Sequence, residues 1–240
     1  MLVRCFSGVL SLKVCEYLSV RRAFGLVRQS TPASGRVTFD ELGIMCHLAN
    51  VGKPLRTSEI AEHQGVLRPT MTHRAGHLSE LGLIERRMGR TDRRSVCCSL
   101  TDAGVSEVRR IVTGVCRNIT AGMPLCRCTP RRMSLIIDEC ARATVSSADM
   151  VLMALADTAD NERGRTVSEL VSYLGLLQPT VSMAVSSLEK AGLAGRSEPD
   201  ARGIAGVCLA DAGRRRARQV EEQLESLRVG HARVNSPSVL

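Results

Sequence analysis

The chain of 240 residues carries 33 Lys and Arg against 24 Asp and Glu, which gives a formal net charge of +9. Its length allows two small domains, and its basic excess is typical of a protein with a polyanionic partner. No run of apolar residues approaches the roughly 20 that a membrane-spanning helix needs, and Lys13 and Glu16 interrupt the apolar start, so we expect no membrane segment and no signal peptide. Ten cysteines without a secretory signal predict free thiols in the cytoplasm.

The first half of the chain predicts several helices and one hairpin. Apolar residues spaced by three and four predict a helix over 2–28, and Thr38 with Glu41 has the pattern of a capping box for the next helix. Thr57 or Ser58 is expected to cap a short helix that ends before Gly65. Further helices are expected from Pro69 to Gly82 and from Thr101 to about Thr120, with strands over 83–88 and 95–100 between them. This order is that of a winged helix-turn-helix.

The second half repeats the same order after a linker at 123–128. Helices are expected over 131–144, 148–156, 167–173, 180–191 and 211–227, with a hairpin within 193–209. The polar tail 229–240 is expected to be disordered. The sequence therefore predicts a mainly α fold with small β-wings. Two winged helix-turn-helix units, 1–122 and 129–228, would be joined through long helices of the dimerisation type.

One segment of the chain occurs twice. Gly65-Val66-Leu67-Arg68-Pro69-Thr70 returns as Gly175-Leu176-Leu177-Gln178-Pro179-Thr180, at a spacing of 110 residues. Identical residues continue at this spacing, including the pairs Leu78 and Leu188, and Gly82 and Gly192. A repeat this long predicts two similar units rather than a solenoid. Two like units are what symmetric DNA-binding dimers use to span two half-sites.

These motifs resemble the MarR family of bacterial winged-helix transcription regulators. The similar stretches of the first half are 57–61, 69–72, 78–86, 92–95 and 100–104, and those of the second half are 179–182, 188–193, 200–202 and 210–213. Members of this family are usually homodimers joined through their first and last helices. The resemblance therefore implies a monomeric, single-chain pseudo-dimer that binds double-stranded DNA and requires no cofactor.

A helix in the major groove needs polar side chains on one face and apolar ones on the other. In the first unit, Met71, Ala75, Leu78 and Leu81 form the apolar stripe. The residues predicted to contact DNA are Arg68, Thr70, Thr72, His73 and His77 on the helix and Arg90, Arg93 and Arg94 in the wing. Threonine methyls suit thymine, arginine and histidine suit guanine, and wing arginines suit the minor groove and the phosphates. The resemblance adds weight to Asp92 and Arg94.

The second unit offers a less basic set of candidates. They are Gln178, Thr180, Ser182, Met183, Ser186 and Arg202, and acidic and basic residues balance between 175 and 202. Because phosphate contacts dominate affinity for DNA, the two halves are predicted to be unequal. Both halves carry Leu (Leu67 and Leu177) where the family often has a Ser cap, which predicts less firmly fixed helix starts.

Some members of the family respond to oxidants through a thiolate, and others bind phenolic or metal effectors. The corresponding candidates in this chain are Cys15 with Tyr17 and Cys46 with His47. The simpler interpretation treats the cysteines as small buried hydrophobic residues. Cys126 and Cys128 lack the two-residue gap of zinc knuckles, and no metal site is expected. His73 and His77 have a spacing compatible with a metal, but their position favours contact with DNA.

The sequence favours a DNA-binding transcriptional regulator, a repressor that responds to a small molecule or an oxidant. The alternative is a protein-interaction module whose second winged helix has lost DNA binding. An enzyme is not expected, because the sequence contains no P-loop, no Gly-x-Ser-x-Gly and no paired metal motif.

Overall fold

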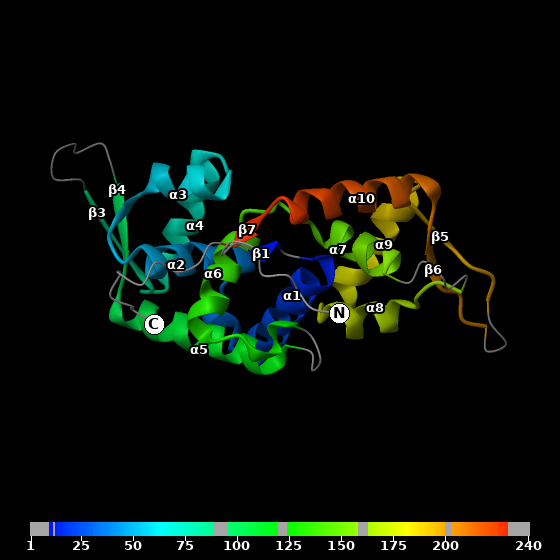
Figure 1. Cartoon of the computed structure of the whole chain (residues 1–240), viewed down its shortest axis with the longest axis horizontal. Helices are drawn as coiled ribbons and strands as arrows, with labels where there is room; N and C mark the ends of the chain where they lie inside the picture. The colour runs from blue at the N-terminus through cyan, green and yellow to red at the C-terminus, as the bar shows by residue number, and fades with distance from the viewer. Residues whose placement is uncertain are drawn as a thin grey trace. The chain divides into compact units, whose positions relative to one another are not determined.

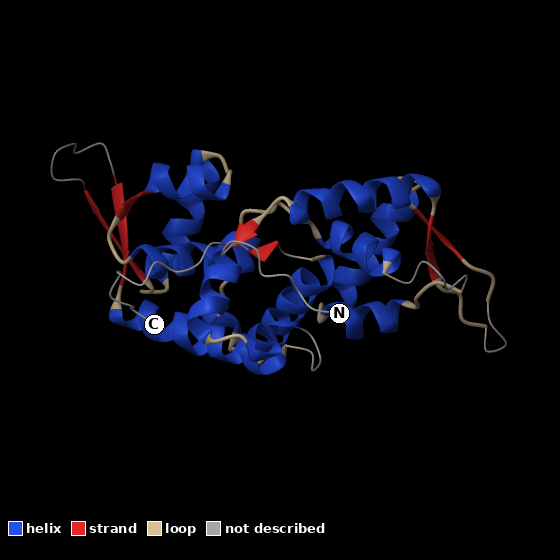
Figure 2. Ribbon diagram, in the orientation of Figure 1, coloured by secondary structure: helices blue, strands red, loops and turns tan. Residues whose placement is uncertain are grey.

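The structure is a computed structural model that describes residues 10–11, 13–88, 96–119, 124–157, 163–199 and 203–229. Helices make up most of this part of the chain, and the strands form small antiparallel sheets (Figure 2). The predicted fold class, mainly α with β-wings, is confirmed. None of the described helices is both long enough and apolar enough to cross a membrane. Contacts divide the chain into two compact units. The first contains Val27–Ala143 with the strands at both ends, and the second contains Leu12–Leu26 and Thr144–Ser226.

The first unit is a winged helix-turn-helix with additional helices (Figure 1). Between its two terminal strands, its elements are η1 (Ala33–Gly35), α2 (Phe39–Val51), β2 (Leu55–Arg56), α3 (Thr57–Gln64), α4 (Arg68–Glu80), β3 (Ile84–Met88), β4 (Val96–Leu100), α5 (Asp102–Asn118), η2 (Pro124–Arg127) and α6 (Pro130–Cys140). Strand β4 lies between β2 and β3, and a separate pair joins β1 (Leu10–Ser11) to β7 (Arg228–Val229). The core of this unit is aliphatic, as the composition predicts, with Leu42, Ile60, Met71 and Ile137 fully buried.

The helix starts in this unit follow the predicted capping chemistry, with one shift. Thr38 and Glu41 form the capping box of α2, and Gly52 ends that helix in the left-handed conformation. The cap of α3 is Arg56, whose backbone N–H donates to Glu59 Oε2 at 2.6 Å, rather than Thr57 or Ser58. The shift arises because Leu55 and Arg56 pair with β4 and thereby fix the start of the helix.

The second unit has the same order of elements. They are α7 (Ser147–Ala156), α8 (Val167–Leu174), α9 (Gln178–Lys190), β5 (Ala194–Arg196), β6 (Val207–Leu209) and α10 (Asp211–Glu225). Helices α8 and α9 have the bounds of α3 and α4 displaced by the 110-residue spacing of the repeat. Ser146 and Asp149 form the capping box of α7, in the role of Thr38 and Glu41.

The first helix of each half belongs to the other half's unit, which differs from the predicted domain boundaries. Helix α1 (Val14–Gln29) contributes its residues up to Leu26 to the second unit, and α6 lies in the first unit. Close packing explains the position of α1. A Cβ on Gly25 would lie 2.5 Å from the carbonyl oxygen of Gly175, and Arg22 Nε donates to the carbonyl of Ser172 at 3.2 Å.

Several predicted limits near these helices also change. The helix predicted over 2–28 begins at Val14, and Leu10–Ser11 is a strand because it pairs with Arg228–Val229. The predicted helix 131–144 ends at Cys140, and the predicted linker contains η2. Val229, the first residue of the predicted disordered tail, belongs to β7, and the rest of that tail lies outside the described residues.

Candidate nucleic-acid interface

Helix α4 presents one apolar and one polar face, as the sequence predicts. Met71, Ala75 and Leu78 are fully buried, whereas Leu81, predicted to join them, is only half-buried. The exposed residues of this helix include the predicted contacts Arg68, Thr70, Thr72 and His73. Pro69 fits the first turn because its missing N–H would have no partner within the helix there. The helix therefore offers hydrogen-bonding groups of the kind that read base edges.

Polar contacts fix α4 to the two helices before it. Arg74 forms an ion pair with Asp40 of α2 and donates to Gln64 Oε1 of α3 at 3.2 Å. The buried Gln64 side chain donates in turn to the carbonyl of Asp40 at 3.0 Å. These three side chains hold the helix-turn-helix as one body, and the sequence analysis did not identify them.

His77 also helps to hold α4 against α2. Its Nδ1 lies 2.7 Å from Glu41 Oε1, and the Glu41 carboxylate is buried at the start of α2. His77 was predicted to contact DNA, but this bond leaves only its Nε2 for another partner. The geometry of His77 therefore favours positioning of α4 on α2.

The wing of the first unit begins on an exposed strand. After Ile84, all of the remaining residues of β3 are exposed, so the strand extends away from the core (Figure 1). Arg86 and Arg87 on this strand were missed as candidates by the sequence analysis, and Arg87 Nε lies 2.8 Å from Glu85 Oε1. Whether both faces of a strand are exposed depends on the tertiary structure, and the alternation of polar and apolar residues along the sequence does not reveal it. The predicted contacts Arg90, Arg93 and Arg94, with Asp92, lie outside the described residues.

Helix α9 of the second unit has a similar buried stripe and a different outer face. Val181, Ala184, Val185 and Leu188 are buried. Of the predicted contacts, Gln178, Met183 and Ser186 are exposed, and Thr180 and Ser182 are half-buried. The side chain of Met183 is 74% exposed. Arg202 lies outside the described residues.

Ion pairs compensate cations near α9. Arg196 Nε lies 2.6 Å from Glu189 Oε1, and Arg163 Nη2 lies 3.1 Å from Glu169 Oε1. At the 110-residue spacing, Arg86 corresponds to Arg196, but Ser79 stands in place of Glu189. The first unit therefore lacks the carboxylate that pairs with this arginine in the second unit.

The two predicted pairs of effector residues lie in different units. Cys15 and Tyr17 lie on the part of α1 that belongs to the second unit, whereas Cys46 and His47 lie on α2 of the first. Tyr17 is fully buried, and its hydroxyl accepts from Arg21 Nη1 at 2.8 Å. Burial raises the pKa of both the Cys15 and the Cys46 thiol. Because the thiolate is the reactive form, this geometry does not favour an oxidant sensor at either cysteine.

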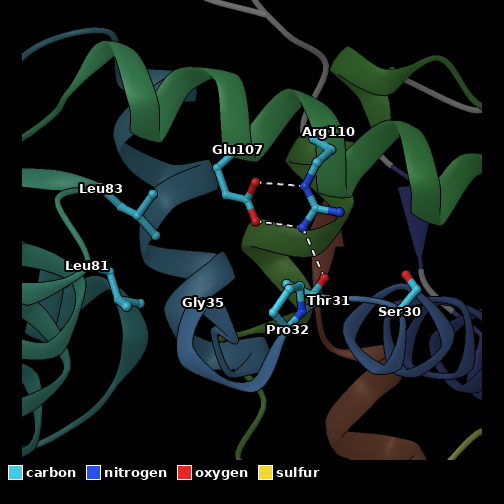
Figure 3. Close-up of a pocket in the computed structure, with 8 residues that line it drawn as sticks. All are labelled: Ser30, Thr31, Pro32, Gly35, Leu81, Leu83, Glu107 and Arg110. Atoms are coloured by element: carbon cyan, nitrogen blue, oxygen red, sulfur yellow. Dashed lines mark hydrogen bonds and ion pairs between the residues drawn. The ribbon is translucent and has the colours of Figure 1, made fainter.

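A pocket of about 440 Å³ lies in the first unit (Figure 3). Its lining residues are Ser30, Thr31, Pro32, Gly35, Leu81, Leu83, Glu107 and Arg110. The guanidinium of Arg110 bonds both oxygens of Glu107, at 2.6 and 2.7 Å, and also donates to Thr31 Oγ1 at 3.1 Å. The pocket thus combines apolar side chains with an oriented charged pair.

The sequence of the second unit's helix-turn-helix matches a known family. Residues 150–203, which include α8, α9 and β5, match the MarR family. These residues form a MarR-family domain. The crystal structure of the YusO protein from Bacillus subtilis is similar over 41% of this chain and 64% of its own, with 26% identity and a TM-score of 0.34. The chain thus covers less than two thirds of YusO, and no curated protein matches it. The MarR match does not extend to α4 of the first unit.

Proposed function

We propose that this protein is a transcriptional regulator that binds double-stranded DNA through two winged helix-turn-helix units of unequal strength. The observation that carries the proposal is the outer face of α4, where Arg68, Thr70, Thr72 and His73 are exposed opposite a fully buried stripe. The MarR match of the second unit supports the same function.

The two units are proposed to be a tandem duplication that acts as a pseudo-dimer. The common element order and the displaced bounds of α3/α8 and α4/α9 support this origin. The membership of α1 in the second unit and of α6 in the first gives further support, because family dimers are joined through such terminal helices. One chain would then carry both DNA-binding units, and the sequence of each unit could change independently.

The regulator is proposed to be a repressor that a small molecule releases. The pocket beside Glu107 and Arg110 supports a small-molecule effector, since it includes Leu81 and Leu83, which directly follow α4. A ligand bound in this pocket would shift the C-terminal end of α4, the helix proposed to contact DNA bases. The raised pKa values of the Cys15 and Cys46 thiols favour this effector class over an oxidant.

The test is a footprint of the full chain on DNA flanking its own gene, together with the salt dependence of its affinity. We expect two protected blocks roughly 10 bp apart, centre to centre, and affinity that falls steeply as salt rises, because bound arginines release counterions. Absence of protection at low salt, on this DNA and on random fragments, would contradict the proposal.

That negative result would favour the second candidate, a protein-interaction module. Its specific support is an exposed apolar side chain on the outer face of α9, where Met183 is 74% exposed at the position that His73 occupies in α4. Such residues suit a protein partner better than a phosphate backbone.

A further inference from the structure

Three helices of the first unit bring two histidines and one aspartate together. His47 comes from α2, His63 from α3 and Asp138 from α6. His47 Nδ1 lies 3.1 Å from Asp138 Oδ2, and His63 Nε2 lies 2.8 Å from Asp138 Oδ1. The two imidazole rings are stacked, with centroids 3.6 Å apart and planes 15° from parallel. One carboxylate therefore holds both rings with a nitrogen of each directed at it.

Neighbouring side chains orient this carboxylate. Asn50 Nδ2 donates to Asp138 Oδ2 at 3.1 Å, and Ser134 Oγ donates to Asn50 Oδ1 at 3.0 Å. Asp138 is buried. Carboxylates that bind metal ions are usually held by such supporting hydrogen bonds, which fix their orientation.

The donor atoms have the chemistry and the spacing of a metal site. One ligand atom from each of the three residues lies within 4.8 Å of the other two. In tetrahedral zinc sites, bonds of about 2.0–2.1 Å separate the ligand atoms by about 3.3 Å. His47 Nδ1 lies 3.1 Å from Asp138 Oδ2 and His63 Nε2 lies 2.8 Å from Asp138 Oδ1, so each nitrogen is close to that separation from a different oxygen of the carboxylate. Two imidazoles and one carboxylate suit zinc and related transition metals, with the fourth position left to solvent.

We propose that His47, His63 and Asp138 form a binding site for a divalent transition-metal ion of the zinc class. The ion would bind the ring nitrogens that now face the carboxylate, and a proton on such a nitrogen would move to the other nitrogen of the ring or be released to solvent. The histidine side chains are 14% and 22% exposed, so the site is reached from solvent. Sequence spacing gave no signal for it, because the three ligands come from three separate helices and Asp138 is 75 residues from His63.

The position of His63 links the proposed metal site to α4, the helix proposed to contact DNA. His63 precedes Gln64 in α3. The Gln64 side chain donates to the carbonyl of Asp40 on α2 and accepts from Arg74 on α4. An ion bound to His63, His47 and Asp138 would fix α3 against α2 and α6, and through Gln64 it would fix α4. This consequence rests on the proposed DNA-binding function, whereas the metal site itself does not.

The site is tested by titrating the reduced, full-length protein with Co²⁺, a spectroscopic substitute for Zn²⁺. We expect one equivalent to bind and to produce the visible bands of four-coordinate cobalt. The intense sulfur-to-cobalt charge-transfer band should be missing, because the ligand set contains no thiolate. Zn²⁺ should displace the cobalt.

Two variants and one control decide the assignment. His63→Gln and Asp138→Asn should each weaken Co²⁺ binding at least tenfold, and circular dichroism should show that each remains folded. Asp138→Asn is close to isosteric, which keeps the test valid if His63→Gln unfolds. The control Cys126→Ser removes an exposed thiol outside the cluster and should leave binding unchanged. Absence of binding to the natural chain, a thiolate spectrum, or equal binding by folded variants would overturn the site.

A second measurement separates the regulatory consequence from the site. Zn²⁺ should change DNA affinity several-fold in the natural chain and should not change it in His63→Gln. Bound metal without a change in DNA affinity would overturn the link to α4 while the site stands. A chain that binds no DNA with or without metal would refute the proposed function, and the cobalt titration would still decide the site.

Discussion

The helix-turn-helix of the first unit and that of the second share a scaffold but differ in the groups placed on it. Helices α4 and α9 bury corresponding stripes, with Leu78 and Leu188 in equivalent positions. Polar contacts tie α4 to α2 and α3 through Arg74 and Gln64. The residues at the corresponding positions of the second unit are Ala184 and Leu174, both buried and apolar. The same fold can therefore be held by a polar network or by apolar packing.

The outer faces of α4 and α9 differ in charge because of a few substitutions at equivalent positions. Arg68 begins α4, whereas Gln178 begins α9, and Glu189 neutralises Arg196 in the second unit only. Because the electrostatic part of DNA binding depends on uncompensated cations near phosphates, we expect the second unit to contribute less to the proposed DNA binding although its helix-turn-helix has the same fold.

The largest expected effect tests the shared scaffold. Leu78→Ala and Leu188→Ala each remove a side chain that is at most 3% exposed, and each should lower the free energy of unfolding by about 2–5 kcal/mol because a cavity remains. Denaturant unfolding monitored by circular dichroism measures both. A large loss for one variant with none for the other would show that the two cores are not equivalent.

The next effect concerns the helix starts. Arg68→Ala should weaken DNA binding by roughly 5- to 150-fold, since a guanine or phosphate contact by arginine contributes about 1–3 kcal/mol. Gln178→Ala, the matched variant, should cost markedly less. Fluorescence anisotropy with labelled operator DNA measures the two affinities, and equal losses would refute the asymmetry of the units.

A smaller effect is expected in the salt dependence. Arg94→Ala should reduce the slope of log affinity against log salt by about 1, as for one lost phosphate contact. Arg202→Ala, its counterpart in the second unit, should change the slope less. Titrations over a range of salt concentrations give both slopes, and a larger change for Arg202→Ala would reverse the proposed roles.

The smallest expected effect comes from exchanging the residue type at one pair of equivalent positions, Ser79 and Glu189. Glu189→Ser frees Arg196 and removes a negative charge, so it should raise DNA affinity a few-fold, the scale of an exposed ion pair of about 0.2–1 kcal/mol. Ser79→Glu should lower affinity by a similar factor. The same anisotropy assay applies, and an unchanged affinity in both variants would exclude these positions from the interface.

Local patterns predicted much of the fold. Thr38 with Glu41, Pro69 and Gly82 marked helix limits correctly because caps, prolines and left-handed glycines act on adjacent backbone groups. The strand pair β1–β7 was missed because its members lie at opposite ends of the sequence, and the start of α3 was misplaced because a strand determines it. Within the candidate interface, His77 was correctly assigned to the outer side of the apolar stripe, but its bond to Glu41 depends on a separate helix.

By itself, the sequence determined the helices, the hairpins, the 110-residue repeat and the apolar stripes, because each depends on residues within a few turns or on direct comparison of two segments. Only the tertiary structure decided that α1 packs in the second unit and α6 in the first, since amphipathic periodicity specifies that a face is buried and not which partner buries it. The tertiary structure likewise brought His47, His63 and Asp138 together, because their proximity results from the packing of three helices and has no counterpart in sequence spacing.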